Sequence, residues 1–201
     1  DGQAMTAHFT MTAEDMEAAR EKVEKIDGIR SGMDVLTAIE TRQSIRKFTA
    51  KPVSQDLVTA VLHAGMCAPT AKNKKPYHFI VLREQPVLSM LARNNPNAAM
   101  LEFSAGAIVV CGDKNREGIK EFLYADCAAA AQNMLLGLHG LGLGGVWCGV
   151  APNSEWRKLL IEQLALPPKL EPVSVIAFGW PDEEKELPPR RETAMVHYDR
   201  W

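Results

Sequence analysis

The stretch Thr41-Arg42-Gln43-Ser44-Ile45-Arg46-Lys47-Phe48 decides how the rest of this 201-residue sequence is interpreted. If the stretch is extended, alternate side chains share a face, so Arg42, Ser44 and Arg46 point the same way. Guanidinium groups bind phosphate oxygens through paired hydrogen bonds, and a serine hydroxyl can add another. The pattern predicts a site for a phosphate or a similar planar anion, although taken alone it is also typical of a solvated surface.

Composition restricts what such an anion site can belong to. The chain is 46% hydrophobic, carries a formal net charge of -2 and has no dense basic run. A nucleic-acid partner is therefore not expected, because binding a phosphate backbone requires clustered Lys and Arg. The longest apolar stretches, 128–138 and 173–180, are too short or too interrupted for a membrane span. A cytoplasmic location is expected, and an exported form stays open because the chain begins at Asp1 rather than Met.

The four cysteines, Cys67, Cys111, Cys127 and Cys148, predict buried free thiols. They lie among apolar neighbours, and their spacing matches neither a metal site nor a dense disulfide scaffold. No metal is therefore expected.

The hydrophobic pattern predicts helices interleaved with strands. Helices are expected over 12–26, 34–41, 54–68, 122–141 and 154–164, with shorter ones within 86–100. The helix from Asp34 is expected to bury Val35, Ala38 and Ile39, and the helix over 122–141, apolar on nearly all sides, to be buried at the centre. Strands are expected over 77–82, 107–111 and 173–180, with a short apolar segment at 146–149. This order favours an α+β or α/β structure around one sheet.

A second motif, Ala68-Pro69-Thr70-Ala71-Lys72-Asn73-Lys74-Lys75-Pro76-Tyr77, lies between an expected helix and an expected strand. Set beside the Arg42 stretch, this motif resembles the flavin-binding loop of the FMN-dependent nitroreductase family, whose pattern is close to Ala-Pro-Ser-x-x-Asn-x-Gln-Pro-Trp. The Arg42 stretch is similar to that family's opening motif. Two more segments are similar to that family: the glycine-rich run at 140–145 with Val146-Trp147-Cys148-Gly149, and the Gly179-Trp180-Pro181 turn with Arg190 and Arg191. All four follow the family's order over residues 34–201.

The resemblance implies an α+β nitroreductase-like fold, with a central, mostly antiparallel sheet wrapped by helices. It also implies an interlocked homodimer with two FMN sites at its interface, and a C-terminal tail that crosses onto the partner. Residues 33–201 would form a single FMN-binding domain. Residues 1–32 would form an N-terminal extension with one helix.

The resemblance also assigns the residues around the FMN phosphate. Arg42 and Ser44 would hold the phosphate together with Arg190 or Arg191, because guanidinium groups offset its charge of about -1.5 to -2. Gln43 would make polar contacts near the ribityl chain or the flavin edge.

The remaining assignments concern the flavin ring. Arg46 would lie at its pyrimidine end, where a fixed cation makes reduction easier. Backbone N–H groups in one short segment would reach flavin N5, namely those of Trp147, Cys148 and Gly149. The loop residues that would line the flavin or the phosphate pocket on the dimer side are Pro69, Thr70, Ala71 and Asn73.

These assignments imply an FMN-dependent oxidoreductase. It would transfer hydride from NADH or NADPH through flavin N5 to a nitroaromatic, a quinone or a similar electron-poor small molecule, by a ping-pong mechanism. No catalytic side chain is assigned, because the cofactor performs the hydride chemistry. A dehalogenase-like flavin enzyme, a flavin-binding protein without turnover and a cofactor-free dimeric scaffold are the alternatives. Residues 94–121 are expected to form a substrate lid, and they offer no clear polar set for an amino-acid zwitterion.

Overall fold

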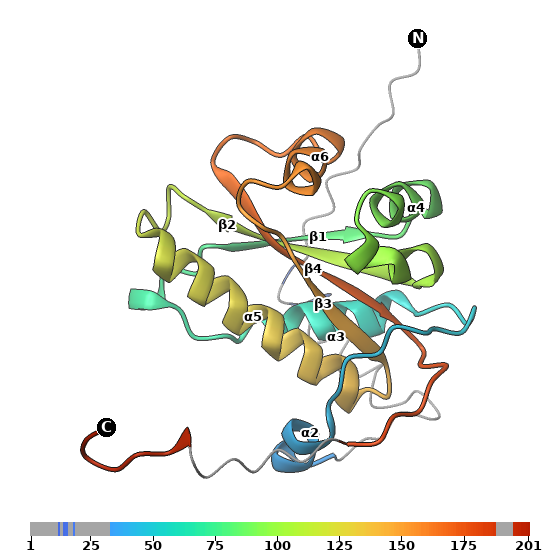
Figure 1. Ribbon diagram of the computed structural model, residues 1–201, viewed down its shortest axis with the longest axis horizontal. Coiled ribbons are helices and arrows are strands. Elements are labelled where there is room, and N and C mark those ends of the chain that lie inside the picture. Colours follow the sequence, from blue (N-terminus) through green and yellow to red (C-terminus); the bar gives the residue numbers. More distant parts are fainter. Residues whose placement is uncertain (1–11, 13, 16–17, 19–32, 188–194) are drawn as a thin grey trace.

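The structure is a computed structural model that describes residues 12, 14–15, 18, 33–187 and 195–201. One antiparallel sheet of four strands, in the order β1-β2-β4-β3, forms its centre (Figure 1). The strands are β1 (Tyr77–Leu82), β2 (Gly106–Asp113), β3 (Gly144–Gly149) and β4 (Leu170–Gly179). Because every pairing is antiparallel, the fold is α+β rather than α/β.

The helices are α2 (Val35–Thr41), α3 (Gln55–Met66), α4 (Gln85–Arg93), α5 (Lys120–Gly140) and α6 (Glu155–Gln163), with 3-10 segments η1 (Ala71–Asn73) and η2 (Pro96–Phe103). Asp34, Ser54 and Ser154 cap α2, α3 and α6 by accepting hydrogen bonds from backbone N–H groups of the first turn. The expected helix over 12–26 lies largely outside the described residues. Among the helices that the structure describes, none has the length and apolarity needed to cross a bilayer.

Strand alternation divides the interior into two cores. Ile108 and Val110 of β2 pack in the core with α3 and α5, whereas Val109 and Cys111 pack in the core with α4, η2 and α6. Figure 1 shows the two helical layers on opposite sides of the sheet. Since both faces are covered, β2 is buried along its whole length.

Three burial predictions are wrong. Only Ala38 of α2 is buried, whereas Val35 is 67% exposed and Ile39 49% exposed. The long helix α5 is not enclosed on all sides, since Phe122 is 47% exposed. Cys67 is also exposed, because it follows the last turn of α3 and lies at the surface.

The expected lid over 94–121 is also incorrect. This range contains β2, which pairs with both β1 and β4 in the middle of the sheet. A strand fixed on both edges and buried on both faces cannot move as a lid without breaking the core. The remainder of the range contains η2, where Ala98 and Leu101 are fully buried.

Candidate functional site

The Arg42 stretch meets the outer edge of β3 at Gly145 and then pairs with the segment that follows β4. Ser44 forms an isolated parallel bridge with Gly145, and the Ile45 N–H donates to the Gly145 carbonyl at 3.1 Å. Ile45 is buried against Gly144, where an added Cβ would lie 2.7 Å from the Ile45 Cβ. The glycine-rich run that follows α5 therefore lets the Arg42 stretch approach the sheet closely.

The segment after β4 holds the other side of this stretch. The Glu183 carboxylate accepts hydrogen bonds from the N–H groups of Arg46 at 2.5 Å and Lys47 at 3.3 Å. Lys185 donates to the Ser44 carbonyl at 2.7 Å and lies 2.9 Å from Glu183. Burial disfavours the charged carboxylate, but these N–H and ammonium donors outweigh burial, so the pKa of Glu183 lies below its ordinary value.

Two backbone donors face outward at the edge of β3. The Gly145 carbonyl points away from β4 toward Ile45, and N–H groups in a strand alternate between its two edges. The N–H groups of Trp147 and Gly149 therefore share this outer edge, whereas that of Cys148 faces β4. Of the three N5 donors predicted from the sequence, two have a suitable direction.

The Cys148 thiol belongs to the core rather than to this edge. Its Sγ lies 3.9 Å from the Asn97 carbonyl oxygen and 3.8 Å from the Met100 sulfur. Burial raises the pKa of Cys148 to about 11, although the nearby Arg46 charge acts in the opposite direction. The thiol stays protonated at neutral pH and is a poor nucleophile.

A cavity of about 580 Å³ lies between α5 and the end of β3. Its lining is almost entirely apolar, apart from one phenol and backbone groups, and consists of Tyr124, Ala125, Ala128, Trp147, Gly149, Val150, Ala151 and Val173. This hollow is shallow and open to solvent. Its apolar surface suits one face of a flat, largely apolar ring, while the edge of β3 supplies hydrogen-bond donors.

The Pro69–Asn73 loop lies at the opposite end of α5 from the Arg42 stretch. The Ala71 N–H donates to the Asp126 carboxylate at 2.9 Å, near the beginning of α5. Thr41, just before the Arg42 stretch, lies 2.8 Å from His139 at the end of α5. With a rise of 1.5 Å per residue, these two contacts are roughly 20 Å apart along the helix. Within one chain, the loop and the Arg42 stretch are therefore not brought together.

The loop itself is held in an uncommon backbone conformation. Lys72, Asn73 and Lys75 have φ values of 53°, 55° and 48°, in the left-handed region. The Thr70 hydroxyl accepts from the Lys75 N–H at 3.0 Å and stabilises this path. Non-glycine residues in this region cost about 1 kcal/mol or more each, and such strain concentrates at functional sites.

Two residues that fix the Arg42 stretch, Glu183 and Lys185, were not predicted from the sequence. The only signal was their alternate spacing after the Gly179-Trp180-Pro181 turn, within a tail that reads as polar surface. Gln43, expected near the ribityl chain or flavin edge, donates to the Lys185 carbonyl at 3.1 Å. Arg190 and Arg191 lie outside the described residues.

Known proteins share both the sequence pattern and the fold. The Nitroreductase family pattern matches residues 39–180. A relative from Methanothermobacter thermautotrophicus, provisionally named NADH dehydrogenase/NAD(P)H nitroreductase, is 39% identical over 176 residues, 88% of this chain and 92% of the relative. A Parabacteroides distasonis structure with the same provisional name is 32% identical, with a TM-score of 0.79 over 83% of this chain and 98% of the other.

A third comparison concerns a cofactor complex. A Desulfovibrio desulfuricans structure, provisionally described as a nitroreductase in complex with FMN, is 31% identical, with a TM-score of 0.76. The match covers 85% of this chain and 99% of the other. Since the family pattern spans most of the sequence and the fold agrees over more than four fifths of it, this chain belongs to the nitroreductase family.

Proposed function

We propose that this chain is an FMN-dependent oxidoreductase that transfers hydride from NADH or NADPH to electron-poor small molecules such as nitroaromatics or quinones. Family membership, the NAD(P)H nitroreductase names of its relatives and the FMN complex of one neighbour support the proposal. One observation carries it: the Arg42 stretch meets β3 at Gly145, on the outer edge that also exposes the N–H groups of Trp147 and Gly149. The Arg46 charge acts on Cys148, the residue between them.

The chain offers suitable groups for each part of FMN. Arg42 and Ser44, with Arg190 or Arg191, would bind the phosphate, and Gln43 would contact the ribityl chain. FMN, when bound, supplies the hydride chemistry at its N5 atom. The outward N–H groups of β3 would donate toward N5, and the Arg46 cation would stabilise negative charge at the pyrimidine end of the ring.

A homodimer would complete this site. We propose that the Pro69–Asn73 loop of a second copy meets the Arg42 stretch of the first, because one chain holds them roughly 20 Å apart along α5. The exposed apolar side chains of α2 and of the C-terminal residues supply surface for such an interface, Leu36 at 67% and Trp201 at 101% exposure among them. If the nicotinamide donor and the electron acceptor bind one after the other over the same flavin ring, the kinetics would be ping-pong.

An anaerobic absorbance titration tests this function. FMN-loaded protein is mixed with NADPH and, separately, NADH, and then with a nitroaromatic or a quinone. We expect the flavin band to bleach and to return. Bound flavin that stays oxidised with both donors would contradict the oxidoreductase function and indicate binding without turnover.

The same titration tests the cation assignment. Arg46→Gln is expected to weaken FMN binding or slow its reduction about tenfold, since a charge-assisted interaction of about 1.4 kcal/mol is lost. Lys47→Gln is the matched control, because it removes the same charge from the next residue, which is also exposed. Equal effects of the two substitutions on FMN binding and reduction would contradict the assignment of Arg46 to the flavin site.

A further inference from the structure

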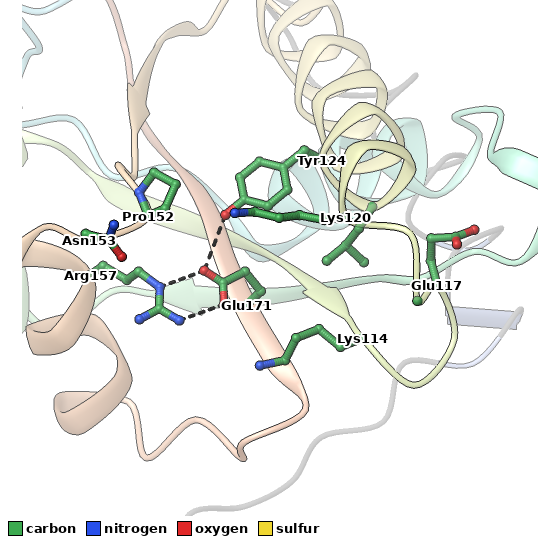
Figure 2. A pocket seen from close by; sticks show the side chains of 10 residues that line it. Lys114, Glu117, Lys120, Tyr124, Pro152, Asn153, Arg157 and Glu171 are labelled. Carbon is green, nitrogen blue, oxygen red and sulfur yellow. Dashed lines mark hydrogen bonds and ion pairs between the residues drawn. The ribbon is translucent and has the colours of Figure 1, made fainter.

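A second cavity, of about 360 Å³, adjoins the apolar cavity described above (Figure 2). It opens between the start of α5, the loop before α6 and the start of β4. Its lining combines apolar surface with five charged side chains: Lys114, Glu117, Gly118, Lys120, Leu123, Tyr124, Pro152, Asn153, Arg157 and Glu171. Tyr124 lines both cavities, so a molecule in one can extend toward the other.

The carboxylate of Glu171 is already fully engaged. Arg157 binds it through two hydrogen bonds, Nε to Oε1 at 2.6 Å and Nη2 to Oε2 at 2.7 Å. The Tyr124 hydroxyl donates to the same Oε1 at 3.3 Å. Burial raises the pKa of Tyr124, and the adjacent Glu171 charge adds to this effect, so the phenol stays protonated. With 11% of its side chain exposed, Glu171 offers little negative charge to a ligand.

The other carboxylate of the lining is paired with a cation. Glu117 accepts a hydrogen bond from the Ile119 N–H at 2.9 Å and lies 2.9 Å from the Lys74 ammonium group. Only 1% of its side chain is exposed. It therefore contributes to the wall of the cavity rather than to the surface that meets a ligand.

Two ammonium groups remain. Lys114 and Lys120 are exposed, and neither forms an ion pair within the part of the chain that the structure describes. Figure 2 shows both side chains reaching toward the Arg157–Glu171 pair, and the Lys120 ammonium lies 5.8 Å from the centre of the Tyr124 ring. Arg157 is paired with Glu171 and Glu117 with Lys74, so the surplus charge comes from the two lysines. The Lys114 charge also helps to lower the pKa of Glu171. The cavity therefore presents a net positive surface.

We infer that this cavity binds an oxyanion group, a carboxylate or a phosphate, of a molecule that reacts at the flavin. The inference rests on the proposed function, because the neighbouring apolar cavity carries the Trp147 and Gly149 edge assigned to the flavin. Lys114 and Lys120 would donate charge-assisted hydrogen bonds to the oxyanion. The oxyanion belongs either to the electron acceptor or to the 2′-phosphate of NADPH.

The kinetic test compares substrates that differ in charge. Steady-state rates of the FMN-loaded protein are measured with 4-nitrobenzoate and with the neutral, nearly isosteric 4-nitrobenzamide, using NADH and then NADPH. We expect Lys114→Gln and Lys120→Gln each to raise the KM for the anionic reactant about tenfold, which is the loss of one charge-assisted hydrogen bond. The KM for the neutral counterpart should stay unchanged.

The two sources of the oxyanion separate in this design. An increase for nitrobenzoate and not for nitrobenzamide assigns the cavity to the acceptor, whereas an increase for NADPH and not for NADH assigns it to the donor. Lys158→Gln is the matched control, since it removes one positive charge beside Arg157 from an exposed side chain outside the cavity. Arg157 is left intact because Glu171 depends on it.

A binding measurement separates this inference from the proposed function. Inorganic phosphate is titrated calorimetrically into FMN-loaded protein, and we expect binding that weakens at least tenfold when Lys114 and Lys120 are both replaced by Gln. This readout requires no turnover, so it stands even if neither nicotinamide reduces the flavin. If the double variant binds phosphate as tightly as the parent chain and keeps every KM, the inference is wrong. Normal bleaching of the flavin in that case would leave the proposed function intact.

Discussion

Glu183 is the side chain on which the position of the Arg42 stretch depends most directly. One carboxylate accepts from two successive N–H groups, those of Arg46 and Lys47, and also pairs with Lys185. With 14% of its side chain exposed, it is shielded enough for these bonds to contribute to stability. The backbone position of Arg46, the proposed flavin cation, therefore depends on a residue outside the flavin site.

Glu183→Gln is expected to lower the free energy of unfolding by about 1–2 kcal/mol at pH 7, because a neutral amide replaces a charged acceptor of backbone hydrogen bonds. Thermal unfolding measures this loss. The control is Glu184→Gln, a neighbouring exposed carboxylate. Equal melting temperatures for the two variants would contradict the role of Glu183.

The same carboxylate predicts a pH dependence. Its pKa is lowered in the folded protein from an ordinary value of 4.5. Its contribution is therefore complete above that ordinary value and is lost as the pH falls through the lowered pKa of the folded state. We expect the stability difference between the parent chain and Glu183→Gln to shrink below about pH 4.5. A difference that stays constant down to pH 3 would contradict the assignment.

Among the elements of the fold, glycines in β3 and at the end of β4 let the Arg42 stretch pack closely against the sheet. Gly144 receives Ile45, and Gly179 receives Phe48, whose ring would lie 2.9 Å from an added Cβ. Both side chains then reach the core with α4, η2 and α6. Because Gly144 and Gly179 have no side chains, Ile45 and Phe48 can pack there, and this packing holds the Arg42 stretch against the sheet.

Gly144→Ala is expected to destabilise the protein by about 1–3 kcal/mol, because its methyl group would overlap Ile45 and push the stretch from the sheet. FMN affinity should fall in parallel. Gly140→Ala is the matched control, since nothing lies within 4 Å of an added Cβ at the end of α5. Chemical denaturation of both variants, with FMN titrations, measures the effects. A Gly144→Ala protein as stable as Gly140→Ala would overturn this account of the packing.

At the scale of the whole molecule, apolar surface remains that one chain does not cover. Val35 and Leu36 of α2 are each 67% exposed, and α2 lies beneath the end of α5 (Figure 1). The C-terminal residues 195–201 lie away from the sheet and its helices in the same view. Neighbouring exposed apolar side chains such as those of α2 are typical of an interface.

Leu36→Glu is therefore expected to dissociate the proposed homodimer and, with it, to release FMN. Sedimentation velocity gives the mass of the particle, and flavin absorbance gives its occupancy. Phe103→Glu, at a position 74% exposed on η2 across the sheet, should change neither. If the Leu36→Glu protein stays dimeric and keeps its flavin absorbance, α2 does not form part of the dimer interface.

Local patterns account for the features that were predicted correctly. The strand over 77–82 and the caps at Ser54 and Ser154 follow from β-branched composition and from side chains that compete for backbone N–H groups. The order of the motifs predicted the family. Strand composition and helix caps depend on a few neighbouring residues, and the motifs are recognised from residue identities alone. Neither requires knowledge of which distant segments are in contact.

Local sequence patterns determined most of the helices and strands, the family, and the residue types available for an anion and a flavin. Tertiary structure alone decided that the Arg42 stretch lies beside β3, that Trp147 and Gly149 rather than Cys148 expose their N–H groups, and that the Pro69–Asn73 loop lies at the far end of α5. The physical reason is that strand register and burial depend on contacts between distant residues. An apolar side chain such as Val35 has the same sequence pattern whether its own chain or a second copy covers it.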